Sequence, residues 1–173
     1  MAAVVQYFDQ LEIGLCVRIN RYGRSPALRR FFSVVSRLGD GGAWLLLGAI
    51  VLALYGTQAV PFVLRAAALA AIGVALYKLL KRRLVRERPY IANDGILCGT
   101  PPLDGYSFPS GHTLHAVCFT ILFGEFEPLL LIVAAPFAAL VAISRIVLGL
   151  HYPSDVLVGA ALGAGLAIAG LST

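Results

Sequence analysis

Residues 59–80 read AVPFVLRAAALAAIGVALYKLL, and this stretch decides the fold class. It carries only Arg65 and Lys78 as charges in 22 positions, and an α-helix needs ~20 mostly apolar residues to cross a bilayer. The basic run KRRLVRERP follows directly, from Lys81 to Pro89. Arginines and lysines at the end of an apolar helix are typical of a membrane span that meets water.

The composition of the whole chain agrees with a membrane protein. Of its 173 residues, 59% are hydrophobic and only 13% are charged, too few charges to cover a water-soluble globule. Further apolar runs are Ala43–Tyr55, Thr113–Gly124, Pro128–Val147 and Val156–Leu171. We therefore expect an all-α integral-membrane bundle of about five transmembrane helices. The runs at 43–55 and 113–124 are short, which a membrane tolerates where adjoining polar groups line a protein cavity.

The first forty residues have a different pattern. Val5–Asn20 and Ala27–Leu38 place apolar side chains at helical intervals among polar ones, which predicts amphipathic helices at the membrane interface. Asp9, Glu12 and Arg18 interrupt the segment where a signal peptide needs an apolar core, so we expect this segment to be retained. The predicted division is an interfacial segment, residues 1–38, and a single transmembrane domain, residues 39–173.

The basic residues form two blocks, and these indicate which loops share a membrane face. Their members are Arg18, Arg21, Arg24, Arg29, Arg30 and Arg37, then Lys78, Lys81, Arg82, Arg83, Arg86 and Arg88. Counting crossings puts the N-terminal segment, the loop 81–110 and the connection around His151 on one face. The positive-inside rule predicts that this face is cytoplasmic, in the cell (inner) membrane. If the second block binds substrate, only the N-terminal arginines support that orientation independently.

The first of three polar motifs on this face runs from Lys81 to Arg88-Pro89. A solvated helix end is the commonest reason for such arginines. The motif could also bind phosphate, because Lys81 supplies a compact charge and Arg88 a planar, bidentate donor.

The second motif, Ser107-Phe108-Pro109-Ser110-Gly111-His112, precedes the third apolar run. Ser110 fits a helix N-cap, and Pro109-Ser110 fits a turn. Gly111 lets the backbone approach a ligand, and the N–H groups at a helix start suit a phosphate. An imidazole at His112 could protonate a leaving alkoxide.

The third motif contains Ser144-Arg145, His151 and Asp155. Arg145 and Asp155 could be simple caps at helix ends. His151 and Asp155 are four residues apart, so either one helical turn or a tight turn at Pro153-Ser154 would bring them together. A carboxylate that accepts the Nδ1 proton leaves Nε2 available as a nucleophile. We therefore predict a nucleophile and its orienting carboxylate.

Together the motifs gather three cations, two imidazoles, one carboxylate and helix-terminal amides on one membrane face. Lys81, Arg88 and Arg145 would repel one another at a membrane boundary unless an anion joins them. The predicted anion is phosphate.

These residues resemble the type 2 phosphatidic acid phosphatase family, which is related to vanadium haloperoxidases and bacterial class A acid phosphatases. The family pattern reads K-x6-R-P, P-S-G-H and S-R-x5-H-x3-D. Every position is filled here, at Lys81, Arg88-Pro89, Pro109-Ser110-Gly111-His112, Ser144-Arg145, His151 and Asp155. The resemblance extends from about Gly39 to the C-terminus.

The resemblance implies a membrane phosphatase that hydrolyses a lipid phosphate or diphosphate through a phosphohistidine. His151 would attack phosphorus, Asp155 would orient it, and His112 would protonate the leaving oxygen and later activate water. The phosphate would be bound by Lys81, Arg88, Ser110, Gly111 and Arg145. No metal or other cofactor is expected, because fixed cations neutralise the phosphate. The expected partners are the lipid substrate and the bilayer, with vanadate as a phosphate-mimic inhibitor and no nucleic acid.

Three alternatives stay open. A vanadate-dependent haloperoxidase could use the same side chains, although membrane embedding argues against it. A phosphotransferase could pass the phosphate from the histidine to another lipid. A noncatalytic protein that binds lipid phosphates would explain the charges but not His151 and Asp155.

The sequence does not choose the substrate. Candidates are phosphatidic acid, phosphatidylglycerophosphate, polyprenyl phosphates or diphosphates, and prenyl-linked sugar phosphates. The loop Tyr90–Tyr106, which includes Asp104, is expected to contact the headgroup. His115 could pair with His112 on a metal, but packing explains it better. Arg65 could face the bundle interior or reach an interface, and no chemistry is assigned to the cysteines Cys16, Cys98 and Cys118.

Overall fold

The stretch at residues 59–80 lies almost wholly within α4 (Val60–Leu84), a 25-residue helix. The computed structural model describes residues 2–172, with side chains from residue 11 onward, and its regular elements in that range are all helical. The other predicted spans are α3 (Ala43–Tyr55), α6 (Gly111–Phe126), α7 (Leu131–Val147) and α8 (Pro153–Leu171). The predicted all-α bundle is confirmed.

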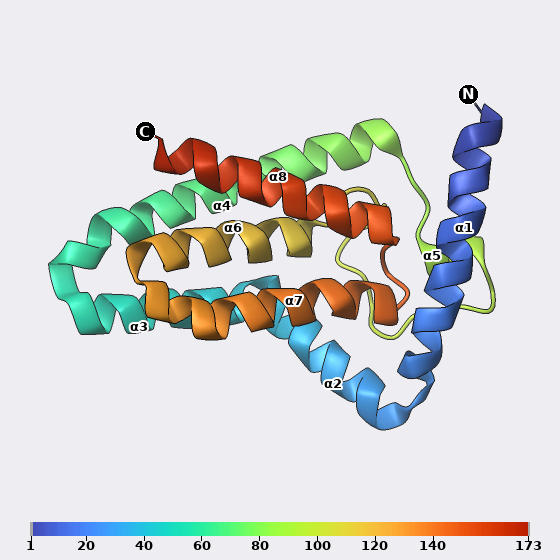
Figure 1. Cartoon of the computed structure of the whole chain (residues 1–173), viewed down its shortest axis with the longest axis horizontal. Helices are drawn as coiled ribbons and strands as arrows, with labels where there is room; N and C mark the ends of the chain where they lie inside the picture. Colours follow the sequence, from blue (N-terminus) through green and yellow to red (C-terminus); the bar gives the residue numbers. More distant parts are fainter. Residues whose placement is uncertain (1, 173) are drawn as a thin grey trace.

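Helix α6 lies in the middle of the bundle, between α8 and α4 on one side and α7 and α3 on the other (Figure 1). Its 16 residues measure about 24 Å, less than the ~30 Å hydrocarbon layer. Its neighbours cover it, so its polar first turn can lie at membrane depth against protein. The short predicted run at 113–124 is therefore a central helix.

Helix α8 packs on α6 through glycines. A Cβ atom at Gly163 would lie 2.2 Å from the carbonyl oxygen of Leu114, and one at Gly159 would lie 2.5 Å from that of Ser110. Small residues of this kind let membrane helices approach closely. The start of α6 is therefore held directly against α8.

An aromatic cluster fixes α3 to α6 and α7. The ring of the buried Trp44 lies 5.3 Å from the rings of Phe119 and Phe137, and 6.4 Å from that of Phe123. Aromatic pairs at such distances add to the stability that burial provides. Before α3, the chain bends sharply at Leu38–Gly42 (η2), where Gly41 has a φ of 135°.

Within residues 2–172, three helical segments are long and apolar enough to cross a membrane: Pro26–Ala92, which contains both α3 and α4, Pro128–Val147 and Pro153–Leu171. Large apolar side chains on the outer surface, such as Leu64, Ile132 and Leu157, are exposed as a lipid-facing surface requires. Arg65 is also exposed, so the alternative that it faces the bundle interior is wrong.

The N-terminal segment consists of α1 (Ala2–Asn20), η1 (Arg21–Arg24) and α2 (Pro26–Arg37). Helix α1 lies across one end of the bundle (Figure 1). Helix α2 packs on α7 and exposes the apolar side chains of Leu28, Phe31 and Val34. An exposed apolar face fits the predicted interfacial location. That location and the division at residue 38 stay predictions.

The loops divide between the two ends of the bundle as the crossing count predicts. The turns η3 (Gly56–Ala59) and η4 (Pro128–Leu130) lie at one end, where Tyr55 donates a hydrogen bond of 3.0 Å to Glu127. The segment 85–110 with α5 (Pro89–Ala92), the connection before α8, and α1 lie at the other (Figure 1). All three motifs are at this second end.

Candidate active site

Two buried cations come from opposite sides of the site. Lys81 is in the last turn of α4, and its Nζ donates to the Tyr106 carbonyl oxygen at 2.8 Å. Arg88 caps α5, and its Nη1 donates to the Leu150 carbonyl oxygen at 2.7 Å. Both side chains are at most 5% exposed. Backbone carbonyls therefore hold these cations in fixed positions.

Arg145, the third cation, lies near the end of α7 and is 2% exposed. Its Nη1 bonds the Ser36 hydroxyl of α2, and its buried Nε has no partner among the described residues. A buried donor without a partner costs free energy that an anionic ligand could recover. Arg145 is therefore placed to bind an anion.

Asp104, in the loop before α6, already contacts two of the cations. Its Oδ1 lies 2.7 Å from both Lys81 Nζ and Arg88 Nη2. Burial raises the pKa of Asp104, but the hydrogen bonds and charges of Lys81 and Arg88 outweigh burial and lower it below its ordinary value. The carboxylate is thus ionised and neutralises part of the cluster.

His151 and Asp155 lie close together at the start of α8. Pro153 begins α8, with Asp155 in its first turn and His151 before it. His151 Nδ1 lies 3.5 Å from Asp155 Oδ2, a contact too long to count as a hydrogen bond. Such contacts in a substrate-free site often tighten only when substrate binds. The structure has neither predicted arrangement in full, because His151 lies outside the helix and Pro153 and Ser154 are the first residues of α8 rather than a separate tight turn.

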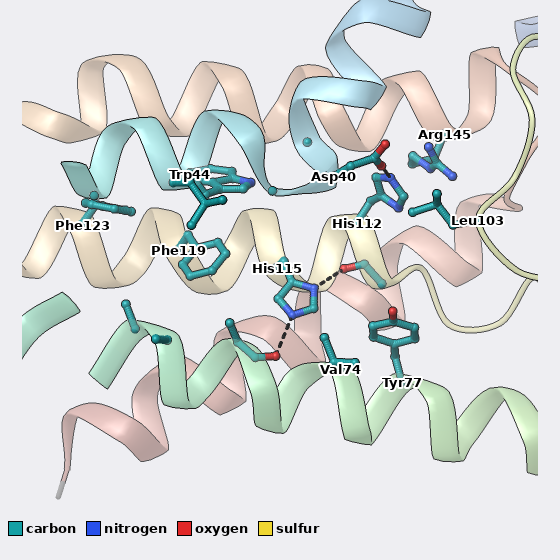
Figure 2. A pocket seen from close by; sticks show the side chains of 18 of the residues that line it. Asp40, Trp44, Val74, Tyr77, Leu103, His112, His115, Phe119, Phe123 and Arg145 are labelled. Atoms are coloured by element: carbon teal, nitrogen blue, oxygen red, sulfur yellow. Dashed lines mark hydrogen bonds and ion pairs between the residues drawn. The ribbon is translucent and has the colours of Figure 1, made fainter. Parts of the chain in front are cut away.

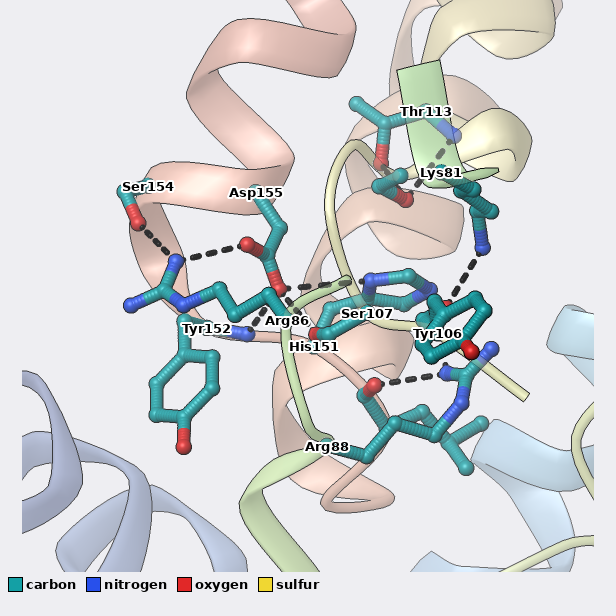
Figure 3. A network of polar contacts seen from close by, with 12 residues as sticks. Lys81, Arg86, Arg88, Tyr106, Ser107, Thr113, His151, Tyr152, Ser154 and Asp155 are labelled. Carbon is teal, nitrogen blue, oxygen red and sulfur yellow. Dashed lines mark hydrogen bonds and ion pairs between the residues drawn. The ribbon is translucent and has the colours of Figure 1, made fainter. Parts of the chain in front are cut away.

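The other ring nitrogen of His151 faces the cations. His151 Nε2 lies 3.4 Å from Arg88 Nη1 (Figure 3). Burial, with the charges of Arg145, Arg88 and Lys81, holds the pKa of His151 well below its usual range. The imidazole is therefore neutral at physiological pH, with a lone pair available on one nitrogen.

Asp155 is fixed by a polar network (Figure 3). Its Oδ2 accepts the Tyr152 amide at 2.8 Å and the Ser107 hydroxyl, and its Oδ1 accepts Arg86 Nη1 at 2.7 Å. The carboxylate is fully buried. Buried carboxylates need such partners, so the network fixes the position of Asp155 beside His151.

The start of α6 follows the predicted capping pattern. Ser110 is the N-cap, its hydroxyl lies 2.9 Å from the Thr113 hydroxyl, and its amide donates to the Asp155 carbonyl oxygen at 3.0 Å. Both polar groups of Ser110 therefore have partners within the protein, and its predicted contact with phosphate stays a prediction. Gly111 and His112 have first-turn amides that no helical carbonyl can bond, and both residues line the cavity.

His112 contacts a residue that the motifs do not contain. Its Nε2 is bonded to Oδ1 of Asp40, in the bend between α2 and α3 (Figure 2). His115, one turn further on, places its ring nitrogens 2.9 Å from the Gly111 carbonyl oxygen and 3.1 Å from that of Ala70. His115 thus ties α6 to α4, as the packing interpretation predicts.

A cavity of about 580 Å³ joins these groups to the membrane-spanning region (Figure 2). Lys81, Arg88 and His151 lie at its polar end. Its remaining walls are mostly apolar and come from α3, α4 and α6, with Trp44, Leu45, Gly48, Leu52, Phe62, Ala66, Ala67, Ala70, Val74, Phe119 and Phe123. A mostly apolar cavity with a few polar groups is typical of a small-molecule site, and this one suits an amphiphile with an anionic head.

Comparison with known proteins decides the family. A family model described as the PAP2 superfamily matches residues 62–173, which contain all three motifs. The chain belongs to the PAP2 superfamily. Decaprenylphosphoryl-5-phosphoribose phosphatase of Mycobacterium tuberculosis is 39% identical over 124 residues, 68% of this chain and 67% of the relative.

Two solved PAP2 structures share the fold. The crystal structure of a transmembrane PAP2-type phosphatidylglycerolphosphate phosphatase from Bacillus subtilis aligns with a TM-score of 0.72 and 28% identity, covering 98% of this chain and 85% of that one. The crystal structure of Aquifex aeolicus LpxE aligns with a TM-score of 0.74 and 29% identity, covering 94% and 96%. The protein is thus an integral-membrane phosphatase of the PAP2 superfamily that acts on lipid phosphates.

Outside the PAP2 motifs, Arg86 and Glu12 also contribute to the site. Arg86 Nη2 lies 2.6 Å from Oε2 of Glu12 in α1, and Ser154 donates its amide to Glu12 Oε1 at 2.7 Å. Helix α1 is thereby joined to the turn that carries Asp155. No sequence spacing pairs these residues, because Glu12 and Arg86 are 74 positions apart.

Proposed function

We propose that this phosphatase works through a phosphohistidine on His151. Nε2 of His151 attacks phosphorus, the bond from phosphorus to the lipid oxygen breaks, and His112 gives a proton to that oxygen. His112 then takes a proton from water, the water oxygen attacks phosphorus, the P–N bond breaks, and inorganic phosphate leaves. The observation that carries this proposal is the neutral, buried His151 between the buried carboxylate of Asp155 and three cations.

The cations are proposed to bind the nonbridging phosphate oxygens. Arg88 lies beside the attacking nitrogen, and the buried Nε of Arg145 has no hydrogen-bond partner in the part of the chain that the structure describes. Fixed donors of this kind stabilise the charge of a phosphoryl-transfer transition state without having to reorganise. Lys81 and the amide of Gly111 complete the proposed cradle. Vanadate, which mimics phosphate, is proposed to inhibit at this site.

We propose that the hydrocarbon tail of the substrate lies in the apolar part of the cavity, between α3 and α4. The name of the mycobacterial relative gives a polyprenyl-linked sugar phosphate as its substrate, and a long single chain of this kind fits the walls that run from Trp44 to Phe62 and Phe123. The N-terminal arginines lie at the same end of the bundle as the site. Because basic segments favour the cytoplasmic side, we propose that the site faces the cytoplasm at the cell membrane.

The test is phosphate release by the detergent-purified chain, with chelator present, from long-chain lipid phosphates. His151→Ala is expected to abolish release, because it removes the covalent route. Arg65→Gln is the control, since Arg65 is exposed on α4 and lies outside the lining of the cavity, and it is expected to retain most of the activity. Release by His151→Ala at a rate within about tenfold of the parent, a loss of only ~1.4 kcal/mol of transition-state stabilisation, would contradict the proposal.

A further inference from the structure

Asp40 is held close to the reaction centre by the bend between α2 and α3. Gly41 adopts a φ of 135°, which a residue with a side chain rarely adopts. A Cβ atom at Gly39 would lie 3.0 Å from the Val141 side chain, so the bend packs tightly on α7. The carboxylate of Asp40 is thereby directed at His112, to which it is bonded.

The position of this pair along the cavity indicates what it contacts. The phosphate-binding side chains lie at one end, and Trp44, Leu45 and Gly48 continue from Asp40 along the α3 wall at the apolar end. A lipid with its phosphate among the cations and its tail along α3 therefore has its bridging oxygen beside Asp40 and His112. This oxygen is the leaving group.

We propose that Asp40 is a positioning and specificity-determining residue, which orients His112 as the general acid and makes the enzyme prefer lipid phosphate monoesters over diphosphates. The inference rests on the proposed function. Because Asp40 bonds Nε2 of His112, the second nitrogen, Nδ1, is the one left to face the leaving oxygen. A carboxylate behind an imidazole stabilises the imidazolium that donates the proton.

The chemistry of the two leaving groups gives the preference. A monoester releases an alkoxide, a strong base that needs a proton as its bond to phosphorus breaks. A diphosphate releases a lipid monophosphate, whose second pKa is about 6, so it leaves as a stable anion without a proton. The extra phosphate would also lie beside the carboxylate of Asp40, and like charges at short range repel. Asp40 therefore speeds hydrolysis of the monoester and slows that of the diphosphate.

The test compares farnesyl phosphate with farnesyl diphosphate, which share one tail, in the parent and in Asp40→Asn. We expect kcat/KM for the monophosphate to fall about 10²-fold, as for loss of an oriented general acid. Turnover of the diphosphate should stay within about threefold or rise, because repulsion is removed. Glu125→Gln is the control, since Glu125 is an exposed acid near the C-terminal end of α6, away from the phosphate-binding end of the bundle, and it should leave the ratio unchanged.

An aryl phosphate, whose phenolate leaves without a proton, separates positioning from folding. Asp40→Asn should hydrolyse it nearly as fast as the parent does, and Asp40→Glu, which keeps a carboxylate, should recover part of the monoester rate. Equal losses on all three substrates, or an unchanged monoester rate, would overturn the inference. A His151→Ala variant that still turns over would refute the histidine mechanism itself, whatever the Asp40 ratio is.

Discussion

Replacing Gly159 with alanine tests how closely the site depends on the contact between α8 and α6. The new Cβ atom would lie 2.5 Å from the Ser110 carbonyl oxygen, whereas ordinary contact begins at 3.4 Å, so the two helices must separate locally by about 0.9 Å. The amide of Ser110 donates to the Asp155 carbonyl oxygen at 3.0 Å across the same contact. The separation therefore moves His112 relative to His151.

A displacement of about 1 Å in a catalytic constellation can cost ~10²-fold in rate, and overpacking of this kind costs about 1–3 kcal/mol of stability. We expect Gly159→Ala to lower kcat/KM for phosphate release by about 10²-fold. We also expect it to lower the thermal midpoint, measured in the same detergent. Gly165→Ala, on the same helix, is the control, because no heavy atom lies within 4 Å of its new Cβ. Equal kcat/KM values for the two variants would refute the packing argument.

Three further predictions concern charge, the cavity and pH. Asp104→Asn should strengthen inhibition by inorganic phosphate about tenfold, or ~1.4 kcal/mol, because it removes an anion from Lys81 and Arg88. Inhibition would be measured in steady-state assays. Weaker inhibition would mean that Asp104 chiefly holds the cations in place. Gly48→Leu places a large side chain in open space at the cavity wall. It should lower kcat/KM for a long-chain lipid phosphate about tenfold and leave kcat/KM for a short-chain soluble ester unchanged. Equal losses for both substrates would contradict the proposed position of the tail. Because the pKa of His151 is lowered in the folded protein, the unfolded state alone binds that proton as the pH falls below about 6.5. The thermal midpoint should therefore fall between about pH 7 and pH 5, and less so in His151→Asn; equal falls in both proteins would exclude this histidine as the cause.

Hydropathy and motif spacing predict the helical bundle and the meeting of the motifs at one end. Apolar runs specify membrane helices directly, because the bilayer requires ~20 apolar residues in each span. Residues 60–80 accordingly lie within α4, and the loops alternate between the two ends of the bundle as the crossing count predicts. The four-residue spacing of His151 and Asp155 is compatible with more than one backbone geometry. Only the structure shows that His151 lies before α8 and Asp155 in its first turn.

Long-range partners could not be predicted in the same way. Asp40 and His112 are 72 positions apart, and the bend that joins them depends on Gly41 and on packing against α7. The charges of the three cations also do not depend on a ligand alone, because Asp104 supplies a carboxylate to Lys81 and Arg88. Sequence spacing identifies chemistry within a motif, whereas these contacts are set by the tertiary fold.

Trapping the phosphoenzyme would show directly whether His151 is the nucleophile. His112→Ala would be mixed with an aryl phosphate, whose leaving group needs no proton, so that the first step proceeds while the hydrolysis that needs a base is slowed. The quenched protein would be digested under conditions that preserve phosphohistidine and mapped by mass spectrometry. Phosphate on His151, and none in the His112→Ala, His151→Ala double variant, is the predicted result. Phosphate on another residue, or turnover without any phosphorylated His151, would contradict the account.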